Sequence, residues 1–155
     1  LKSRGLSDRT QQESLWGRLE SLGVERQRVT LLGALPSQAE HMACYHQVDM
    51  ALDTFPYNGT TTSCEALWMG VPVVTMRGDR HAARVGASLL TQAGLPEWIA
   101  EDEEGYARLA LDWARRPEAL AALRHSLRAR LLQTPLTDAS AFTRHLEAAF
   151  FTMTS

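Results

Sequence analysis

Three consecutive threonines, Thr60 to Thr62, stand where an apolar segment gives way to an expected helix. The preceding residues 48–55 are mostly apolar with little alternation, which is typical of a strand buried on both faces of a parallel sheet. This strand ends in the turn residues of segment 56–59. Backbone N–H groups of a first helical turn, the positive end of the helix dipole and threonine hydroxyls all bind phosphate oxygens. The spacing predicts a phosphate site, although threonines at a helix start also serve simply as caps.

Glu65 is expected in the first turn of this helix, one helical step beyond the threonines. A carboxylate at that point can accept hydrogen bonds from both hydroxyls of a ribose. The same residue also completes a capping box with Thr62, in which the glutamate returns to the backbone of the cap residue. Spacing alone leaves these two interpretations open.

The motif Asp-Thr-Phe-Pro-Tyr-Asn-Gly-Thr-Thr-Thr and its continuation through residue 88 closely resemble the C-terminal half of the O-GlcNAc transferase family, in its bacterial branch with tetratricopeptide repeats. The resemblance runs from about Leu22 to the C-terminus and includes segments 35–41 and 134–142. It implies a two-domain GT-B fold with a cleft for a UDP-sugar, from which the sugar passes to serine or threonine of proteins. It also implies that no metal or other cofactor is needed, because helix amides and threonines would neutralise the diphosphate.

The resemblance assigns a role to particular residues. It implies that Thr61 and Thr62 hold the diphosphate and that Glu65 takes the ribose position. His41 matches a histidine that packs against the nucleotide, and the backbone around Leu35 matches the stretch that reads the uracil edge. An alternative for His41 is a surface position on a helix that a Ser37–Glu40 capping box begins. The predicted nucleotide-sugar-binding set is Leu35, His41, Gly59, Thr60, Thr61, Thr62 and Glu65.

The chain departs from the family pattern at several positions. Thr60 stands where animal members carry a histidine, Ser37 or Gln38 replaces a lysine, and Cys44 replaces an arginine. The family also has an essential phosphate-binding lysine on an earlier helix, whereas the only lysine here is Lys2. No catalytic residue is therefore predicted within this chain, and the lysine is expected upstream.

A length of 155 residues corresponds to one domain. We expect residues 1–155 to form a single C-terminal nucleotide-sugar-binding domain. On this interpretation the first strands, the acceptor-side domain and any repeats lie upstream, and the fragment alone is inactive in transfer.

Helices and strands are expected to alternate, which predicts an α/β fold with a Rossmann-like parallel sheet, flanking helices and further helices at the C-terminus. Ligands of such sheets bind beyond the carboxyl ends of the strands, where the threonines lie. The expected strands are 28–33, 48–55, 71–76 and 97–100. The expected helices are 9–22, 37–46, one that begins in the threonines, 79–93, and a helical region from 101 to 155 that is broken near Pro117 and Pro135.

Composition indicates a globular domain of the cytoplasm. The formal net charge is −2, and charges are scattered, so neither a nucleic-acid groove nor a membrane span is expected. Cys44 and Cys64 have neither zinc nor disulfide spacing. Asp49 and Asp53 suggest a phospho-accepting receiver domain, but no lysine follows them. Arg84 is expected to tie its helix to the sheet, and the tryptophans at apolar positions are expected in the core.

The principal hypothesis is the UDP-sugar-binding part of a protein O-glycosyltransferase that transfers a hexose or N-acetylhexosamine to an acceptor protein. A non-catalytic binding or scaffold module with a decayed sugar site is the alternative, motivated by the lost histidine, lysine and arginine positions. A third candidate, which the resemblance does not favour, is a UDP-sugar epimerase of GT-B architecture.

Overall fold

The computed structural model describes residues 1–154, and its contacts divide the chain into two compact units, one of residues 1–43 and one that begins at Cys44. Whether both units form the single domain expected from the sequence stays a prediction. The helices are α1 (Arg9–Ser21), α2 (Gln38–Ala43), α3 (Thr61–Trp68), α4 (Val85–Gln92), α5 (Glu103–Ala114), α6 (Pro117–Leu131) and α7 (Ala139–Thr154), and the strands are β1 (Ala51–Leu52), β2 (Val73–Met76) and β3 (Ile99–Ala100). Short 3-10 helices lie at Arg4–Ser7, Arg26–Arg28, Cys44–Gln47, His81–Ala83, Pro96–Trp98 and Pro135–Thr137.

The first unit is built around α1. The Asp8 carboxylate caps this helix by accepting hydrogen bonds from the N–H groups of Thr10 and Gln11, and Gly23 follows its end with a φ of 77°. Trp16 is buried beneath the Arg26 guanidinium, which lies 5.0 Å from the ring centroid. The predicted helix 9–22 is thereby confirmed.

The strand predicted at 28–33 is not formed as a strand. Within the described residues its pairing is a single parallel bridge between Lys2 and Leu32, and residues 26–28 coil into a 3-10 helix instead. The apolar pattern therefore identified an extended segment, but too few neighbouring backbone groups pair with it to make a ladder.

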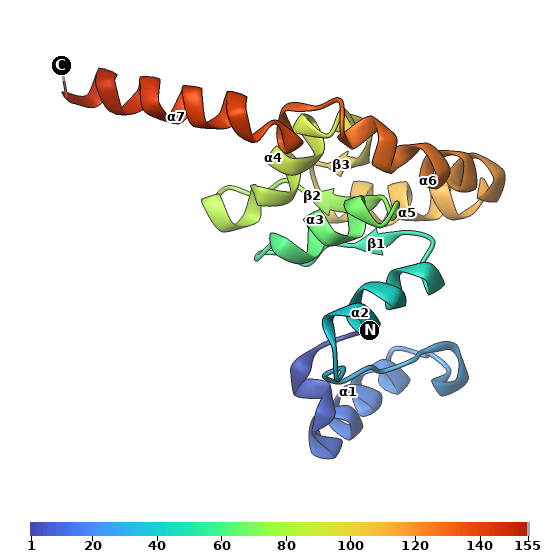
Figure 1. Ribbon diagram of the computed structural model, residues 1–155. Coiled ribbons are helices and arrows are strands. Elements are labelled where there is room, and N and C mark those ends of the chain that lie inside the picture. Colours follow the sequence, from blue (N-terminus) through green and yellow to red (C-terminus); the bar gives the residue numbers. More distant parts are fainter. Residues whose placement is uncertain (155) are drawn as a thin grey trace. The chain divides into compact units, whose positions relative to one another are not determined.

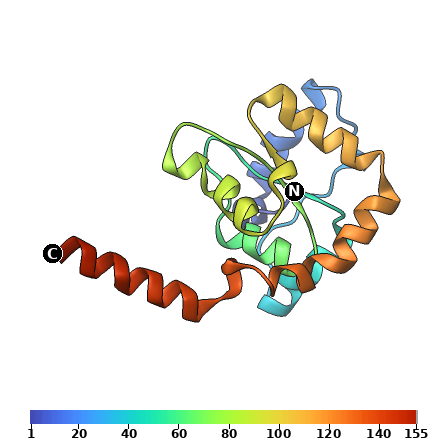
Figure 2. The same cartoon turned by 90° about the horizontal axis from the view of Figure 1, so that it is seen from above.

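Strands β1, β2 and β3 form a parallel sheet in that order in the second unit. Helix α3 connects β1 to β2 and α4 connects β2 to β3, and these two helices pack together on one side of the sheet while α5 covers the other (Figures 1 and 2). This arrangement confirms the predicted parallel α/β fold. The strands are shorter than predicted. Strand β1 is reduced to Ala51–Leu52, because directly after Asp53 the chain enters the loop of residues 54–60, here called the threonine loop.

The core of the second unit lies between the sheet and its helices. Gly94, with a φ of 70°, follows the end of α4, and Pro117 occupies the first position of α6. Both boundaries agree with the sequence expectation. The indole rings of Trp98 and Trp113 stack at 4.3 Å between centroids. The core position is confirmed for Trp98, whereas Trp113 is partly buried and packs against the core. The largest fully buried apolar side chains are Leu67, Val71, Pro72, Val73, Val74, Leu90, Leu95, Trp98 and Leu127.

Helix α7 closes the described chain and carries several exposed apolar side chains, among them Phe142 and Met153. It follows the 3-10 helix at Pro135–Thr137, where the break near Pro135 was predicted. No helix within residues 1–154 is long and apolar enough to cross a membrane.

Candidate phosphate site at the start of α3

The threonine loop lies at the carboxyl end of β1, where the chain enters α3. Thr60 is the N-cap residue and Thr61 the first helical residue, and Thr60, Thr61 and Thr62 are all exposed. The Thr60 side chain makes no capping hydrogen bond to any residue in the described chain. The first-turn N–H groups and the threonine hydroxyls thus lie together at an exposed helix start, as the sequence predicted.

The helix start corrects one sequence expectation. Because α3 begins at Thr61, Thr62 is not the cap residue and Glu65 lies beyond the first turn. The Thr62–Glu65 capping box is therefore wrong, and so is the placement of Glu65 in the first turn. A run of three similar residues gives no signal for which of them is the cap, which explains the shift in register.

The Glu65 carboxylate contacts a tyrosine side chain, whereas the capping-box alternative required the backbone of a cap residue. The Tyr45 hydroxyl lies 3.4 Å from Glu65 Oε2 and donates to the carbonyl of Thr62 at 3.2 Å. Burial, and then the Glu65 charge, raises the pKa of Tyr45 to about 12, so this hydroxyl keeps its proton near neutral pH. Tyr45 therefore holds the Glu65 carboxylate within one helical turn of the threonines.

Asp53, at the end of β1, holds the threonine loop through its side-chain carboxylate. It is only 8% exposed, and its Oδ1 accepts hydrogen bonds from the N–H groups of Gly59 at 2.7 Å and Thr54 at 3.0 Å. Its Oδ2 accepts from the hydroxyl of Thr75 on β2 at 2.7 Å. Burial raises the pKa of this carboxyl above its ordinary value, while these three hydrogen bonds act in the opposite direction.

The backbone of Asp53 is held by a side chain of α5. The Tyr106 hydroxyl donates to the Asp53 carbonyl at 2.8 Å, and its ring packs edge-on against Phe55. Burial followed by the nearby Asp53 charge raises the pKa of Tyr106 to about 12. The end of β1 is thus fixed by side chains from both β2 and α5.

Asn58 fixes the middle of the loop and is 1% exposed. Its side-chain amide donates to the Thr54 carbonyl at 2.9 Å, and its side-chain oxygen accepts from the Gly86 N–H at 3.1 Å. The Asn58 backbone N–H donates to the Ala82 carbonyl at 2.8 Å. Both side-chain polar groups and the backbone N–H have partners within the protein, so Asn58 joins the threonine loop to the start of α4.

The remaining predicted site residues, Leu35 and His41, belong to the first unit. Leu35 precedes α2 and His41 lies on it, both partly exposed. The Ser37 hydroxyl accepts from the Glu40 N–H at 3.2 Å, which confirms the cap of this helix. His41 Nδ1 lies within hydrogen-bonding distance of Lys2 Nζ, so the only lysine of the chain meets the predicted nucleotide histidine. The roles of Leu35 and His41 stay predictions.

Other polar residues that suggested chemistry have structural partners. Asp49 is exposed and pairs with Arg124 at 2.7 Å, and Arg84 donates to the Gly78 carbonyl at 3.0 Å at the end of β2. Arg84 thus ties its helix to the sheet region, as predicted. Within residues 1–154 no group of three or more histidine, cysteine, aspartate or glutamate side chains is arranged to hold a metal ion.

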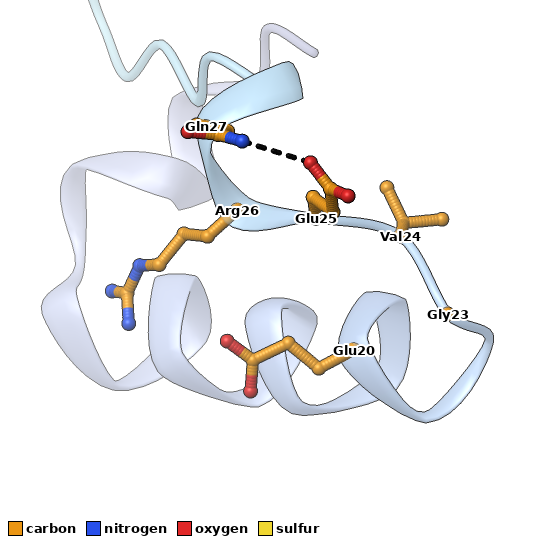
Figure 3. Close-up of a pocket in the computed structure, with 6 residues that line it drawn as sticks. All are labelled: Glu20, Gly23, Val24, Glu25, Arg26 and Gln27. Carbon is orange, nitrogen blue, oxygen red and sulfur yellow. Dashed lines mark hydrogen bonds between the residues drawn. The ribbon is translucent and has the colours of Figure 1, made fainter.

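An open hollow of about 570 Å³ lies in the first unit beside α1 (Figure 3). Its lining includes Glu20 and Glu25, with the Glu25 carboxylate accepting a hydrogen bond from the Gln27 side chain at 2.8 Å. None of the predicted nucleotide residues lines it.

A parallel sheet with an exposed helix start at the carboxyl edge is the arrangement of nucleotide-binding α/β proteins. The chain belongs to glycosyltransferase family 41, whose model matches residues 10–146. Three known proteins show the extent of the similarity.

A probable UDP-N-acetylglucosamine–peptide N-acetylglucosaminyltransferase, SPINDLY, of Hordeum vulgare is 50% identical over 135 residues, which are 87% of this chain and 14% of that protein. The probable enzyme of the same description named SEC, from Arabidopsis thaliana, is 36% identical over 75% of this chain and 12% of its own length. A solved O-GlcNAc transferase mutant from Thermobaculum terrenum matches with a TM-score of 0.89 and 43% identity, over 97% of this chain and 29% of that chain. The chain therefore spans a small part of the length of its relatives.

Proposed function

We propose that this chain is the donor-nucleotide part of a protein O-glycosyltransferase, and that it holds the diphosphate of a UDP-sugar at the start of α3. The observation that supports this proposal most strongly is the exposed set Thr60 to Thr62 at a helix start whose cap residue makes no side-chain hydrogen bond in the described chain. The chain also belongs to glycosyltransferase family 41. In such a site the N–H groups and hydroxyls of Thr61 and Thr62 would hold the phosphate oxygens.

The leaving group of this reaction is a nucleoside diphosphate, on which negative charge increases as the bond to the sugar breaks. Donors aimed at that charge and fixed in advance stabilise the transition state more than donors that must reorganise. Gly59 leads into the threonines and is tied to Asp53, so the loop is held before any ligand arrives. Helix α3 would therefore supply the charge stabilisation of the reaction.

The remaining predicted residues would bind the nucleoside. Glu65 lies on the same helix as the threonines, and its carboxylate is held by the Tyr45 hydroxyl. This carboxylate would accept hydrogen bonds from the ribose hydroxyls. In the family resemblance, His41 packs against the nucleotide and the backbone at Leu35 reads the uracil edge.

Replacing both Thr61 and Thr62 by valine tests the phosphate role. Valine keeps the branched shape and removes the hydroxyl donors, so we expect UDP to bind about tenfold more weakly, as measured by isothermal titration calorimetry. The matched control is Thr143→Val on the exposed surface of α7, where the hydroxyl only returns to its own helix. Unchanged UDP affinity in the double variant would refute the phosphate role.

The Glu65 assignment is tested by comparing UDP with 2′-deoxy-UDP. The protein is expected to prefer UDP severalfold, since one donor to the carboxylate is missing in the deoxy nucleotide. The Glu65→Ala variant should bind both nucleotides equally. A preference that persists in the variant would assign the ribose contact to another residue.

Several wider features, which follow from the family resemblance or, for the location, from composition, are part of the proposal. They are an acceptor-side domain and tetratricopeptide repeats in the whole protein, a bacterial origin, a cytoplasmic location, and transfer of a hexose or N-acetylhexosamine to serine or threonine of an acceptor protein. Transfer is also proposed to need no metal, so activity of the whole protein should survive treatment with EDTA.

A further inference from the structure

Asp53 is a buried carboxylate beside the proposed phosphate site, yet the proposed chemistry gives it no direct role. A carboxylate and a phosphate repel each other, so Asp53 cannot bind the diphosphate itself. Its oxygens are instead fully engaged by the N–H groups of Gly59 and Thr54 and by the Thr75 hydroxyl. Three donors on one buried side chain form an organised network.

We propose that Asp53 is the positioning residue of the threonine loop. By accepting a hydrogen bond from the Gly59 N–H, it sets the positions of the Thr60 to Thr62 N–H groups. The action is through the hydrogen bonds of the side chain and not through its charge. The nature of the ligand rests on the proposed function, whereas the positioning itself is a property of the protein without ligand.

Gly59 is the point through which Asp53 controls the helix start. A Cβ atom placed on Gly59 would lie 2.7 Å from the hydroxyl oxygens of both Thr62 and Ser63, so the loop folds closely back on the first turn of α3. Gly59 leaves no room for a side chain here and is bonded directly to the cap residue Thr60, so the position of Gly59 also sets where the helix begins. The 2.7 Å bond from the Gly59 N–H to Asp53 therefore fixes the loop and the helix start together.

The Asp53 carboxylate is itself held in place by Thr75 on β2 and Gly86 on α4. A Cβ atom on Gly86 would lie 2.4 Å from Asp53 Oδ2 and 2.2 Å from the hydroxyl oxygen of Thr75. Thr75 is fully buried, and its hydroxyl donates to the same Oδ2. Only glycine fits at position 86. The Gly86 backbone and the Thr75 hydroxyl together restrict the conformation of the Asp53 side chain.

The conservative substitution Asp53→Asn separates hydrogen bonding from charge. An asparagine oxygen can still accept the Gly59 and Thr54 N–H groups, while its NH₂ group faces the Thr75 hydroxyl, which can turn to accept. We expect Asp53→Asn to bind UDP within about threefold of the unchanged protein, since the bond to Gly59 survives. Asp53→Ala removes all three acceptors and should weaken UDP binding by about tenfold or more.

The experiment combines this affinity comparison with NMR amide signals of the protein without ligand. In the unchanged protein the Gly59 amide is expected to be protected from hydrogen exchange. Asp53→Ala should lose that protection and shift the Thr60 to Thr62 amides, whereas Asp53→Asn should keep it. Unchanged signals of α5 and α6 show that each variant is folded. Thr75→Val, which removes one donor at nearly constant volume, should shift Gly59 in the same direction by less.

The outcomes separate this inference from the proposed function. Protection of Gly59 that is lost in Asp53→Ala supports the positioning role even where UDP does not bind, and the absence of binding then counts against the nucleotide function alone. An unprotected Gly59 amide in the unchanged protein, or one that Asp53→Ala leaves unaltered, overturns the inference. So does an Asp53→Asn variant that loses as much UDP affinity as Asp53→Ala. If Asp53→Ala does not fold, a Gly59 amide that Thr75→Val leaves unmoved overturns it.

Discussion

Helices α3 and α5 both begin after a strand of the same parallel sheet, yet their first turns differ in charge and in capping. The start of α5 is closed by its own residues: the Asp102 carboxylate accepts the Gly105 N–H at 2.7 Å, and Glu103 and Glu104 add negative charge in the first turn. The first turn of α3 has no acidic residue, and its cap Thr60 makes no side-chain bond to a described residue.

The difference shows that position in the fold does not by itself make a phosphate site. Both helix starts lie at the carboxyl edge of the sheet, where ligands of such folds bind. Aspartate and glutamate neutralise the positive end of a helix and would repel a phosphate at α5. At α3 the same positive end is left for a ligand, which is why we assign the diphosphate there.

Converting the α3 start into an α5-like start should give the largest effect. In Thr60→Asp, the new carboxylate would accept first-turn N–H groups and place a negative charge where the phosphate is proposed to bind. We expect UDP affinity to fall by about a hundredfold, equivalent to roughly 3 kcal/mol, by calorimetry. The thermal midpoint should be kept or rise slightly, because aspartate is at least as good an N-cap as threonine.

Thr60→Ser is the control for this change, since it retains a neutral hydroxyl at the cap. It should bind UDP nearly as the unchanged protein does. A Thr60→Asp variant that binds UDP with undiminished affinity would show that the ligand does not approach the start of α3.

Removing the cap of α5 should affect stability and leave the ligand alone. Asp102→Ala exposes the Gly105 N–H and is expected to lower the free energy of unfolding by about 1 kcal/mol in urea titrations. UDP affinity should not change. Weaker UDP binding in this variant would remove the contrast between the two helix starts.

The smallest expected effect concerns the pH dependence of folding. Burial raises the pKa of Asp53 in the folded protein, so ionising this group costs more there than in the unfolded chain. Its contribution to stability is therefore complete below its ordinary pKa and is lost as pH rises through the higher folded value. Relative to Asp53→Asn, the unchanged protein should lose stability over that rise, as measured by urea titrations at successive pH values. A constant difference between the two proteins across the same pH range would contradict the raised pKa.

The sequence predicted the alternation of helices and strands because strong local signals mark the boundaries. Gly23 and Gly94 have the positive φ angles of helix ends, and Pro117 begins α6. Strand lengths were overestimated, since an apolar run shows which residues are buried but not where backbone pairing stops. The strand expected at 28–33 failed for this reason, with the Lys2 and Leu32 bridge as its pairing within the described chain.

The candidate site was predicted in part. The threonines lie at the helix start that follows the apolar strand, as expected, but the capping box placed the N-cap at Thr62, two residues beyond its position at Thr60. The roles of Asp53 and Asn58 were missed, because their partners on β2 and α4 are distant in sequence and no local pattern brings them together. A polar residue in an otherwise apolar strand, followed closely by asparagine and glycine, was the signal available.

The most direct test of the account follows individual backbone amide signals by NMR while UDP is added, with ADP as the control for the base. The account predicts that the largest shifts fall on Thr60, Thr61, Thr62 and Ser63 at the start of α3, that Glu103, Glu104 and Gly105 at the start of α5 stay unchanged, and that ADP produces smaller shifts. No shift at the α3 residues, or shifts of equal size at both helix starts, would contradict the assignment of the diphosphate to α3.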